Sequence, residues 1–515
     1  MPENEIPPVS RGDIYFCRCN ILSAAGNNTL DNVKLFGRQI LKNSREALSA
    51  DFDENIALMD RILRYGESFD LIKRTMTMSG CRTVMYYIDG FVKAELMQKL
   101  MLYLVTVKDF GSGNPGDAKK FADTSVPSVE VDVTNDVENI VTNILAGCTA
   151  FFSEGFGADC IIIDARTYPA RETSEPENDK VMRGSRDGFV ETMIFNTAMI
   201  RRRIRDPQLT VKYLSAGSSS RTDMALCYLE GTADPGYVKN LVSKIQNMNT
   251  SSIVLGHRSV AETLIKNHWY NPFPKVRTTE RPDAVAASIL EGNVVLICDN
   301  SPEAMIFPTT IFDFLQEADD YYFPPLTGTY LRLVRHAVFW LTVIMTPLWY
   351  LLIMHQDILP QWLMFIVPAE SGSLPIIVQL FLTEFVLDGL KLASLNTPST
   401  LSNSLSVVGG LLLGDFAVQV GWLCPDVILY MSFVAIANFT QSSYELGYAF
   451  KYIRMLTLLL TALFGVWGFA AGLITGIVLA AVNKTVDGKR NYFYPLIPFN
   501  GKALARLFFR LKKRD

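Results

Sequence analysis

The stretch Ala337–Met354, AVFWLTVIMTPLWYLLIM, decides the fold class, because it carries no charged side chain along its whole length. A helix of this length and composition can span the hydrocarbon core of a bilayer. Further apolar stretches follow it near Ile376–Leu395, Leu405–Trp422, Val427–Thr440 and Leu456–Val482. The last third of the chain is therefore predicted to be an α-helical polytopic membrane domain.

The rest of the chain has a different composition, with charged residues every few positions before about Phe323. A length of 515 residues is too great for one compact domain. The net charge of -4 gives no reason to expect a nucleic-acid partner. The N-terminal MPENEIPPVSRGD is polar and proline-rich, so no signal peptide is expected.

Two soluble α/β subdomains are predicted before the apolar stretches. In the first, Val84, Tyr86 and Ile88 alternate along Arg82–Phe91, as in a strand with one buried face. Asn135–Leu145 then returns to helical spacing. The predicted boundaries are 1–40 for a flexible N-terminal arm, 41–150 and 151–330 for two cytoplasmic α/β subdomains, 331–483 for the transmembrane helices and 484–515 for a basic cytoplasmic tail.

The second subdomain is predicted from Ala158–Ala165, ADCIIIDA, a continuous apolar run typical of a buried strand. Arg186–Asp206 has the pattern of an amphipathic helix that ends in a cluster of arginines between 201 and 205. This cluster could bind phosphate or a lipid headgroup. A solvated helix end, where cations also interact favourably with the helix dipole, is the more frequent explanation. No convincing tandem repeat is visible, and a structural relation between the two subdomains stays open.

No motif for enzyme chemistry is present. The four histidines lack metal-ligand spacing, and the eight cysteines are too scattered for a zinc site or a disulfide framework. GSGNPGDAKK, 111–120, lacks the GxxxxGK[ST] pattern of a phosphate-binding loop. We therefore expect no catalytic residues, no metal, no cofactor and no enzymatic activity.

The most informative charged pair is Glu384 and Asp388, which lie four residues apart inside the second apolar stretch and so share one helix face. An ionisable side chain at membrane depth usually faces a bundle interior or a water-filled path. One hypothesis is a cation-attracting pore or vestibule. The alternative is salt bridging, either to Lys391 at i,i+3 from Asp388 or to a base on another chain. Asp415 is a further candidate for the ion pathway.

Positive charges near the apolar stretches predict the orientation. Arg332 and Arg335 precede the first stretch, and the tail after the last stretch is strongly basic. Both ends of the membrane domain should therefore face the cytoplasm, which requires an even number of crossings. We expect four crossings with Ile376–Leu395 as a re-entrant or interfacial helix, and a count of five or six stays open.

Small residues in the last apolar stretch predict close helix packing. Gly468, Gly472 and Gly476 form a GxxxGxxxG run, a spacing that lets another helix approach closely. The contact could lie within one chain or between copies. With one acidic helix per chain, a channel would need several copies, so a homo-oligomer in a lipid bilayer is expected.

Ordered blocks of sequence carry a family resemblance. The soluble part contains EPENDKVMRGSRDGFVETMIFNTAMIRRRI, 175–204, and TTERPDAVAASILEGNVVLICDNSPEAMIFP, 278–308, and ADDYYFPP, 318–325, leads into the apolar stretches. The apolar part contains TEFVLDGLKLA, 383–393, NSLSVVGGLLLGDFAVQVGWLCP, 403–425, and FVAIANFTQSSYELGYAFKYIRM, 433–455. In this order the blocks resemble the GerA family, the A subunits of spore germinant receptors.

The resemblance implies a role in endospore germination, as a multi-pass protein of the inner spore membrane with partner membrane subunits. It implies an oligomeric ion channel or channel regulator. The ending NYFYPLIPFNGKALARLFFR, 491–510, resembles a sporulation branch of the family associated with relaying or amplifying ion release. A nutrient-sensing germinant receptor A subunit is one alternative, and a non-conducting membrane scaffold for partner subunits is another.

The resemblance also carries over to single residues. Glu384 and Asp388 match the acidic positions of the family's membrane helix, and Lys391 matches a basic one. Arg183, Gly184 and Glu191 match a motif of the soluble domain. We expect that motif to serve the architecture of the subdomain rather than to contact a ligand.

Overall fold

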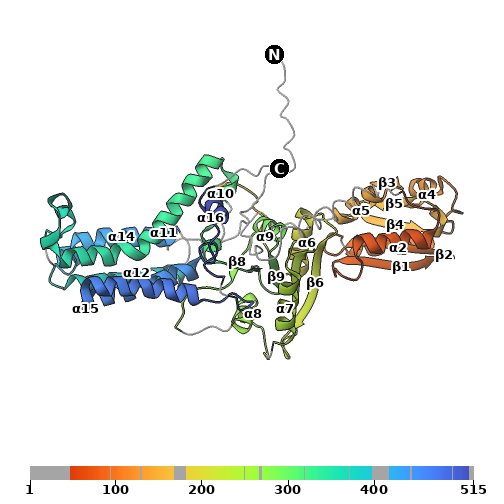
Figure 1. The fold of residues 1–515 in the computed structure, drawn as a ribbon. Coiled ribbons are helices and arrows are strands. Elements are labelled where there is room, and N and C mark those ends of the chain that lie inside the picture. Colours follow the sequence, from red (N-terminus) through yellow and green to blue (C-terminus); the bar gives the residue numbers. More distant parts are fainter. Residues whose placement is uncertain are drawn as a thin grey trace, which may run out of the picture. The chain divides into compact units, whose positions relative to one another are not determined.

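The computed structural model describes two compact units of the chain (Figure 1). It describes residues 47–509, apart from 93, 128–129, 167–180, 249, 266–269, 318, 370–371, 397–416, 441–442 and 490. Unit 1 comprises Met1–Lys266, Val276–Thr309 and Val486–Gly488, and unit 2 comprises Asn267–Lys275, Thr310–Thr485 and Lys489–Asp515. The predicted N-terminal arm, 1–40, lies outside the described residues.

The first half of unit 1 is a five-stranded antiparallel sheet with helices on both faces. The strand order is β1-β2-β4-β5-β3. The elements in chain order are α2 (Phe52–Leu63), β1 (Leu71–Met78), β2 (Cys81–Ile88), α3 (Ala94–Thr106), α4 (Asp117–Ser125), β3 (Val131–Thr134), α5 (Val137–Leu145), β4 (Thr149–Ser153) and β5 (Cys160–Ile163). As the alternation predicts, Val84, Tyr86 and Ile88 share one face of β2, and they pack with α2 and α5. The opposite face packs against α3 and α4.

The second half of unit 1 repeats this topology. Its elements are α6 (Met193–Arg203), β6 (Leu209–Ala216), β7 (Thr222–Leu229), α7 (Pro235–Gln246), α8 (His257–Leu264), β8 (Arg277–Thr279), α9 (Pro282–Leu290), β9 (Val294–Cys298) and β10 (Ala304–Phe307). The strand order β6-β7-β9-β10-β8 is the order of the first sheet, and its pairs are again antiparallel. Helices also stand at the same places in both halves. The two subdomains are therefore structural copies of one arrangement.

The helix predicted over Arg186–Asp206 begins later than its pattern indicated, at Met193. The Asn196 side chain explains the difference, because it bonds both the N–H and the C=O of Val190 and holds the preceding residues extended. The strand predicted for the second subdomain, Ala158–Ala165, belongs instead to the first sheet, because β5 pairs there with β3 and β4.

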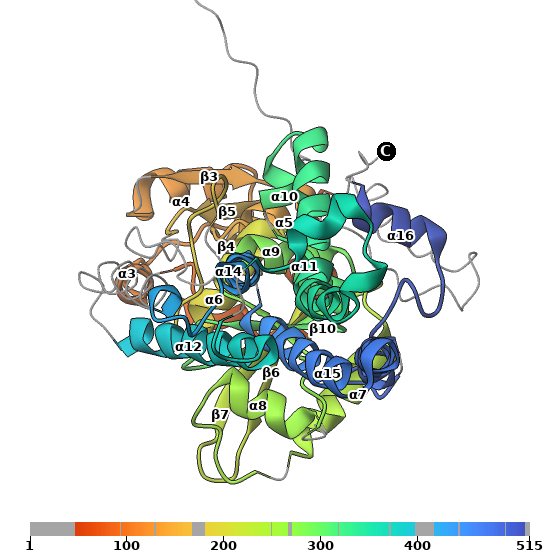
Figure 2. The same cartoon turned by 90° about the vertical axis from the view of Figure 1, so that its left-hand side faces the viewer.

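Unit 2 is a bundle of apolar helices (Figure 2). They are α11 (Pro325–Met354), α12 (Ile376–Asn396), α14 (Pro425–Phe439) and α15 (Tyr444–Val482), with α10 (Asp319–Tyr322) before them and α16 (Gly501–Phe508) after them. Both α11 and α12 pack against α14 and α15. Of the described helices, α11 and α15 are long and apolar enough to cross a membrane. The prediction of further apolar stretches holds for α12 and α14, whereas much of Leu405–Trp422 lies outside the described residues.

The helix α15 folds back on itself. Gly465 interrupts it with φ 58° and ψ −132°, in the left-handed half of the backbone map that favours glycine. A Cβ atom built on Gly476 would lie 2.7 Å from Cγ2 of Ile453. In one straight helix these two residues would stand about 35 Å apart along the axis. The chain therefore reverses at Gly465, and α15 is a hairpin of two antiparallel arms.

The glycine run provides the contact surface of this hairpin. A Cβ on Gly468 would lie 1.8 Å from the carbonyl oxygen of Leu460, and one on Gly472 would lie 2.6 Å from Cα of Thr457. Such distances leave no room for a side chain. The close packing that the GxxxGxxxG spacing predicts is thus found within one chain, where Gly468, Gly472 and Gly476 meet the first arm.

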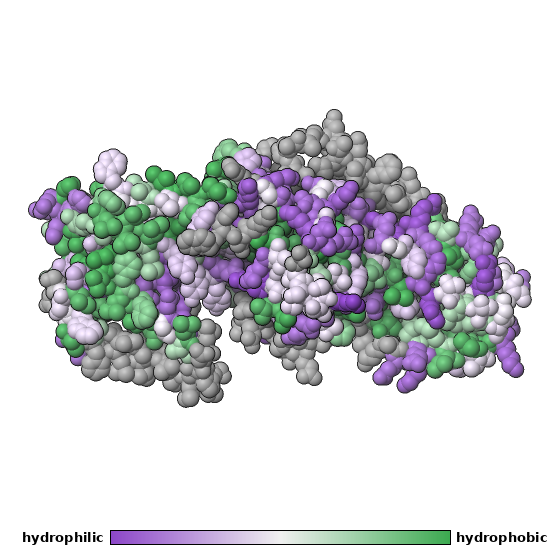
Figure 3. Space-filling model, turned by 90° about the horizontal axis from the view of Figure 1, so that it is seen from below, coloured by the Kyte–Doolittle hydropathy of each residue, from purple (hydrophilic) through white to green (hydrophobic). Residues whose placement is uncertain are grey.

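The face of unit 2 seen in Figure 3 carries large hydrophobic areas (green). Large apolar side chains stand exposed on each of its main helices, including Trp340 on α11, Phe385 on α12, Leu429 on α14 and Trp467 on α15. Monomeric soluble proteins rarely expose continuous apolar surface of this kind, which is typical of membrane or protein contact.

Candidate functional site

Four charged side chains meet inside unit 2, two acids from α12 and two bases from the first arm of α15. The Arg454 guanidinium donates to Oε1 of Glu384 from Nε, at 2.9 Å, and also from Nη2. The Lys451 ammonium lies 3.4 Å from Oε2 of Glu384 and in direct contact with Oδ2 of Asp388. We call these four residues the charge cluster.

The spacing of the sequence brings the charge cluster together. Glu384 and Asp388 are one helical turn apart on α12, and Lys451 and Arg454 are nearly one turn apart on α15. Glu384 faces Arg454 and Asp388 faces Lys451, so the two helices run antiparallel here. Each acid therefore meets a base at the matching level of the bundle.

The two acids of the charge cluster differ in how deeply they are buried. Arg454 is only 1% exposed, and its Nη1 also donates to the Thr342 carbonyl of α11, at 3.2 Å. Glu384 is buried beside it, whereas 34% of the Asp388 side chain is exposed. Breaking a buried ion pair is strongly destabilising because it leaves an uncompensated charge. The contacts thus favour the salt-bridge role for Glu384 and leave Asp388 as the accessible acid.

The remaining predicted charged residues are Lys391 on α12 and Asp415. The Lys391 ammonium stands 5.7 Å from the centroid of the Tyr448 ring, a cation–π arrangement. Lys451 of α15 also contacts Asp388, in a salt bridge between two helices. Asp415 lies outside the described residues.

Lys451 and Arg454 are site residues that were not predicted from the sequence. In a four-crossing arrangement these bases would have stood outside the membrane, just before the last stretch. The structure places both inside α15, where each meets an acid of α12. A usable signal was present, because two bases at i,i+3 in one apolar segment complement two acids at i,i+4 in another.

A second group of ion pairs holds the start of α11. Asp320 is fully buried, and its Oδ2 lies 3.3 Å from Nε of Arg332 and 2.9 Å from Nη1 of Arg335. Arg335 also pairs with Glu317 at 2.6 Å. The arginines that predicted the orientation therefore serve the packing of this segment as well.

In unit 1, the arginine cluster contains a structural ion pair. Arg201 is buried, and its Nε donates to Oδ2 of Asp70 at 2.8 Å. Its Nη2 donates to Ser68 at 3.2 Å and to the Leu209 carbonyl at 2.8 Å. These bonds join the two subdomains, so for Arg201 neither phosphate binding nor a solvated helix end applies.

The soluble-domain motif lies on the surface of unit 1. Arg183, Gly184 and Glu191 are exposed, and Gly184 has a positive φ of 130°. The carbonyl of Glu191 accepts a hydrogen bond from the N–H of Asn300 at 2.8 Å. Within the described ranges, no three His, Cys, Asp or Glu residues form a group that could hold a metal ion.

The fold and the site together define the class of protein. Its members would combine a duplicated antiparallel α/β unit with an apolar helical bundle that holds paired charges inside. Residues 59–515 match the family described as Bacillus/Clostridium GerA spore germination protein, and the chain belongs to this family. The resemblance seen in the sequence blocks is thereby confirmed. Several relatives of the chain are named spore germination proteins.

One of the individual relatives agrees with the predicted sporulation branch. Stage V sporulation protein AF of Bacillus subtilis is 37% identical over 448 residues, covering 87% of this chain and 90% of the relative. Spore germination protein KA of the same organism is 26% identical, covering 90% and 85%. The crystal structure of the N-terminal domain of the A subunit of the Bacillus megaterium germinant receptor GerK3 matches 52% of this chain and 97% of that domain, at 22% identity and a TM-score of 0.39.

Proposed function

We propose that the chain is a multi-pass subunit of the spore germination machinery in the inner spore membrane, where it conducts ions or regulates an ion channel. In this role it relays or amplifies ion release during germination, together with partner membrane subunits. The observation that carries the proposal is the charge cluster, because ionisable side chains inside an apolar bundle usually mark an ion path. The similarity to stage V sporulation protein AF supports the relay role.

Helix directions support six membrane crossings. The Gln379 side chain of α12 accepts from the N–H of Cys424 at 2.8 Å, so α12 and α14 begin at the same end of the bundle. We propose six crossings, namely α11, α12, α14, the two arms of α15 and the apolar stretch expected from the sequence over Leu405–Trp422. An even count keeps both ends of the membrane domain on the cytoplasmic side, as the basic residues predict.

Labelling of engineered cysteines tests this topology in oriented vesicles. A cysteine in place of Phe464, beside the hairpin turn, should react with an impermeant thiol reagent from the outer face. A cysteine in place of Asp487 should react only from the cytoplasmic face. The six-crossing arrangement is wrong if both positions react from the same side.

Asp388 is the residue through which the cluster would act on ions. Its partly exposed carboxylate shares Lys451 with Glu384, so one base balances it only in part. Several copies of the chain around one axis would present a ring of such carboxylates to passing cations. The proposed assembly is a homo-oligomer whose contacts come from the exposed apolar faces, since the glycine run is occupied within the chain.

Ion flux from the purified protein in liposomes tests the conducting role. Asp388→Asn should reduce cation flux while the melting temperature stays near that of the wild type, because the residue is partly exposed. Asp426→Asn, at the start of α14, is a matched control that should leave the flux unchanged.

A non-conducting scaffold is the second candidate, and the balance of charges in the cluster favours it. Two acids face two bases, so a single chain offers no net negative charge to a cation. Wild-type protein that assembles and gives no flux above empty liposomes would select the scaffold and refute the channel.

A further inference from the structure

The duplication of unit 1 allows a comparison of equivalent helices within one chain. The shared strand order pairs β2 with β7 and α3 with α7. The buried positions of α3 are Met97, Leu100 and Leu104, and those at the same spacing on α7 are Val238, Leu241 and Ile245. Each position of α3 therefore has a counterpart on α7.

The two helices differ on the face beside the buried one. On α7 this face is polar, with Ser243 and Gln246, as expected for a helix side in water. On α3 the equivalent residues are Leu102 and Val105, which are 64% and 57% exposed. The apolar face of α3 is therefore not required by the fold, because the second copy of the fold lacks it.

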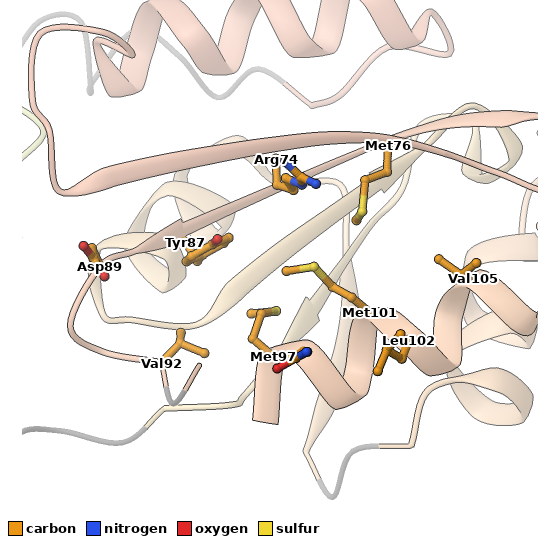
Figure 4. A pocket seen from close by; sticks show the side chains of 10 residues that line it. Arg74, Met76, Tyr87, Asp89, Val92, Met97, Met101, Leu102 and Val105 are labelled. Atoms are coloured by element: carbon orange, nitrogen blue, oxygen red, sulfur yellow. The ribbon is translucent and has the colours of Figure 1, made fainter. Parts of the chain in front are cut away.

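This face of α3 borders a pocket of about 430 Å³ against the strands β1 and β2. A volume of this size suits a small molecule. In Figure 4 the side chains of Met76, Met97 and Met101 point into the space between the strands and the helix. Methionine side chains adapt to ligands of different shapes. The pocket thus offers a flexible apolar lining.

Polar groups border the same pocket. The guanidinium of Arg74 makes no hydrogen bond or ion pair with the described part of the chain, and it lines the pocket together with Tyr87 and Asp89. Burial raises the pKa of Tyr87, Asp89 raises it further and Arg74 opposes the rise. Both charges therefore act on the Tyr87 phenol. A cation without a partner beside an apolar surface is complementary to an anion with an apolar body.

We propose that the pocket between α3 and β1 binds a small molecule with an apolar body and an anionic head group, such as a carboxylate. The head group contacts Arg74, and the body lies against Met101, Leu102 and Val105. This inference concerns unit 1 alone and does not depend on whether unit 2 conducts ions.

Methionine oxidation of the full-length protein in lipid nanodiscs tests the proposal. Peroxide converts accessible methionine to its sulfoxide, which mass spectrometry locates residue by residue. Hexanoate at ten times its Kd should slow the oxidation of Met101 and Met76 by about tenfold, because only the free fraction reacts. Met182, which is 76% exposed and lies outside the pocket, should oxidise at an unchanged rate. Hexanol and hexylamine, which lack the anionic head, should protect poorly.

Two variants test separately the binding of the anionic head group and the binding of the apolar body. Arg74→Met should abolish the protection by hexanoate, and so should the double variant L102S/V105Q, which installs the counterpart residues of the second subdomain. All three positions are exposed, so the fold should survive. Lys119→Met, on the exposed side of α4, is the matched control and should retain full protection.

Several outcomes would overturn the proposal. Equal protection by hexanol, or protection by hexanoate that persists in Arg74→Met, would refute the anionic head group. Protection that appears only when the protein concentration is raised would show that a second copy occupies the pocket. Absence of protection by hexanoate at any concentration would refute a small-molecule site of this class.

Discussion

Replacing Glu384 by Gln should destabilise unit 2 strongly. The substitution keeps the shape of the side chain but removes the negative charge that faces Arg454 and Lys451. Arg454 is 1% exposed, so water cannot solvate the charge that is left behind. Removal of one partner from a buried pair costs about 3–5 kcal/mol. For a domain of this size, the melting temperature should fall by about 6–20 °C.

The measurement is a thermal melt of the detergent-solubilised full-length protein, combined with its abundance in spores. Glu262→Gln, at an exposed position of α8, is the matched control and should melt like the wild type. The double variant Glu384→Gln/Arg454→Gln should recover part of the loss, because neither charge is then unpaired. A Glu384→Gln protein with normal melting and normal abundance would refute the ion-pair interpretation.

Three further predictions concern other parts of the chain. Gly472→Leu should prevent the hairpin from closing and so reduce the yield of folded protein, measured by size-exclusion chromatography. Gly389→Leu is the control and should be tolerated, because no atom lies within 4 Å of a Cβ built there. Asp70→Asn should lower the melting temperature of unit 1 by leaving its buried arginine partner unpaired, and Asp123→Asn, which is exposed, should not. Burial lowers the pKa of His257, so below about pH 6.5 the unfolded chain binds more protons than the folded one. Unit 1 should therefore keep its full stability above this pH and lose part of it below, and the His257→Asn variant should show a flatter pH profile in chemical denaturation.

Hydrophobic periodicity predicted where the strands and helices of unit 1 lie better than it predicted which strands pair. The alternation of Val84, Tyr86 and Ile88 placed β2 correctly, because a strand with one buried face has a period of two. The repeated strand order was not predicted, because hydrophobic spacing indicates which residues are buried and not which strands pair. The late start of α6 depends on the side chain of Asn196 bonding Val190, a local contact that a hydrophobic pattern does not report.

The acids of the candidate site were predicted from the sequence, whereas their partners were not, although the spacing of two bases in an apolar segment offered a signal. Glu384 and Asp388 were found because charges are rare in apolar stretches. Lys451 and Arg454 were set aside because the last helix was taken to begin after them. The reversal at Gly465 was also hidden, since one glycine in an apolar run predicts packing as readily as a turn. Tertiary contacts, rather than local spacing, decide both points.

The way in which the chain alternates between the two units has a mechanical consequence. It passes from one to the other at 266/267, 275/276, 309/310, 485/486 and 488/489. A protease that cuts one of these connections leaves the others intact, so the products should stay together until the chain is denatured. A displacement of unit 1 would likewise pull on both ends of the helical bundle's sequence at once, through Thr310 before α11 and Thr485 after the hairpin. This connectivity gives two covalent routes between unit 1 and the helical bundle.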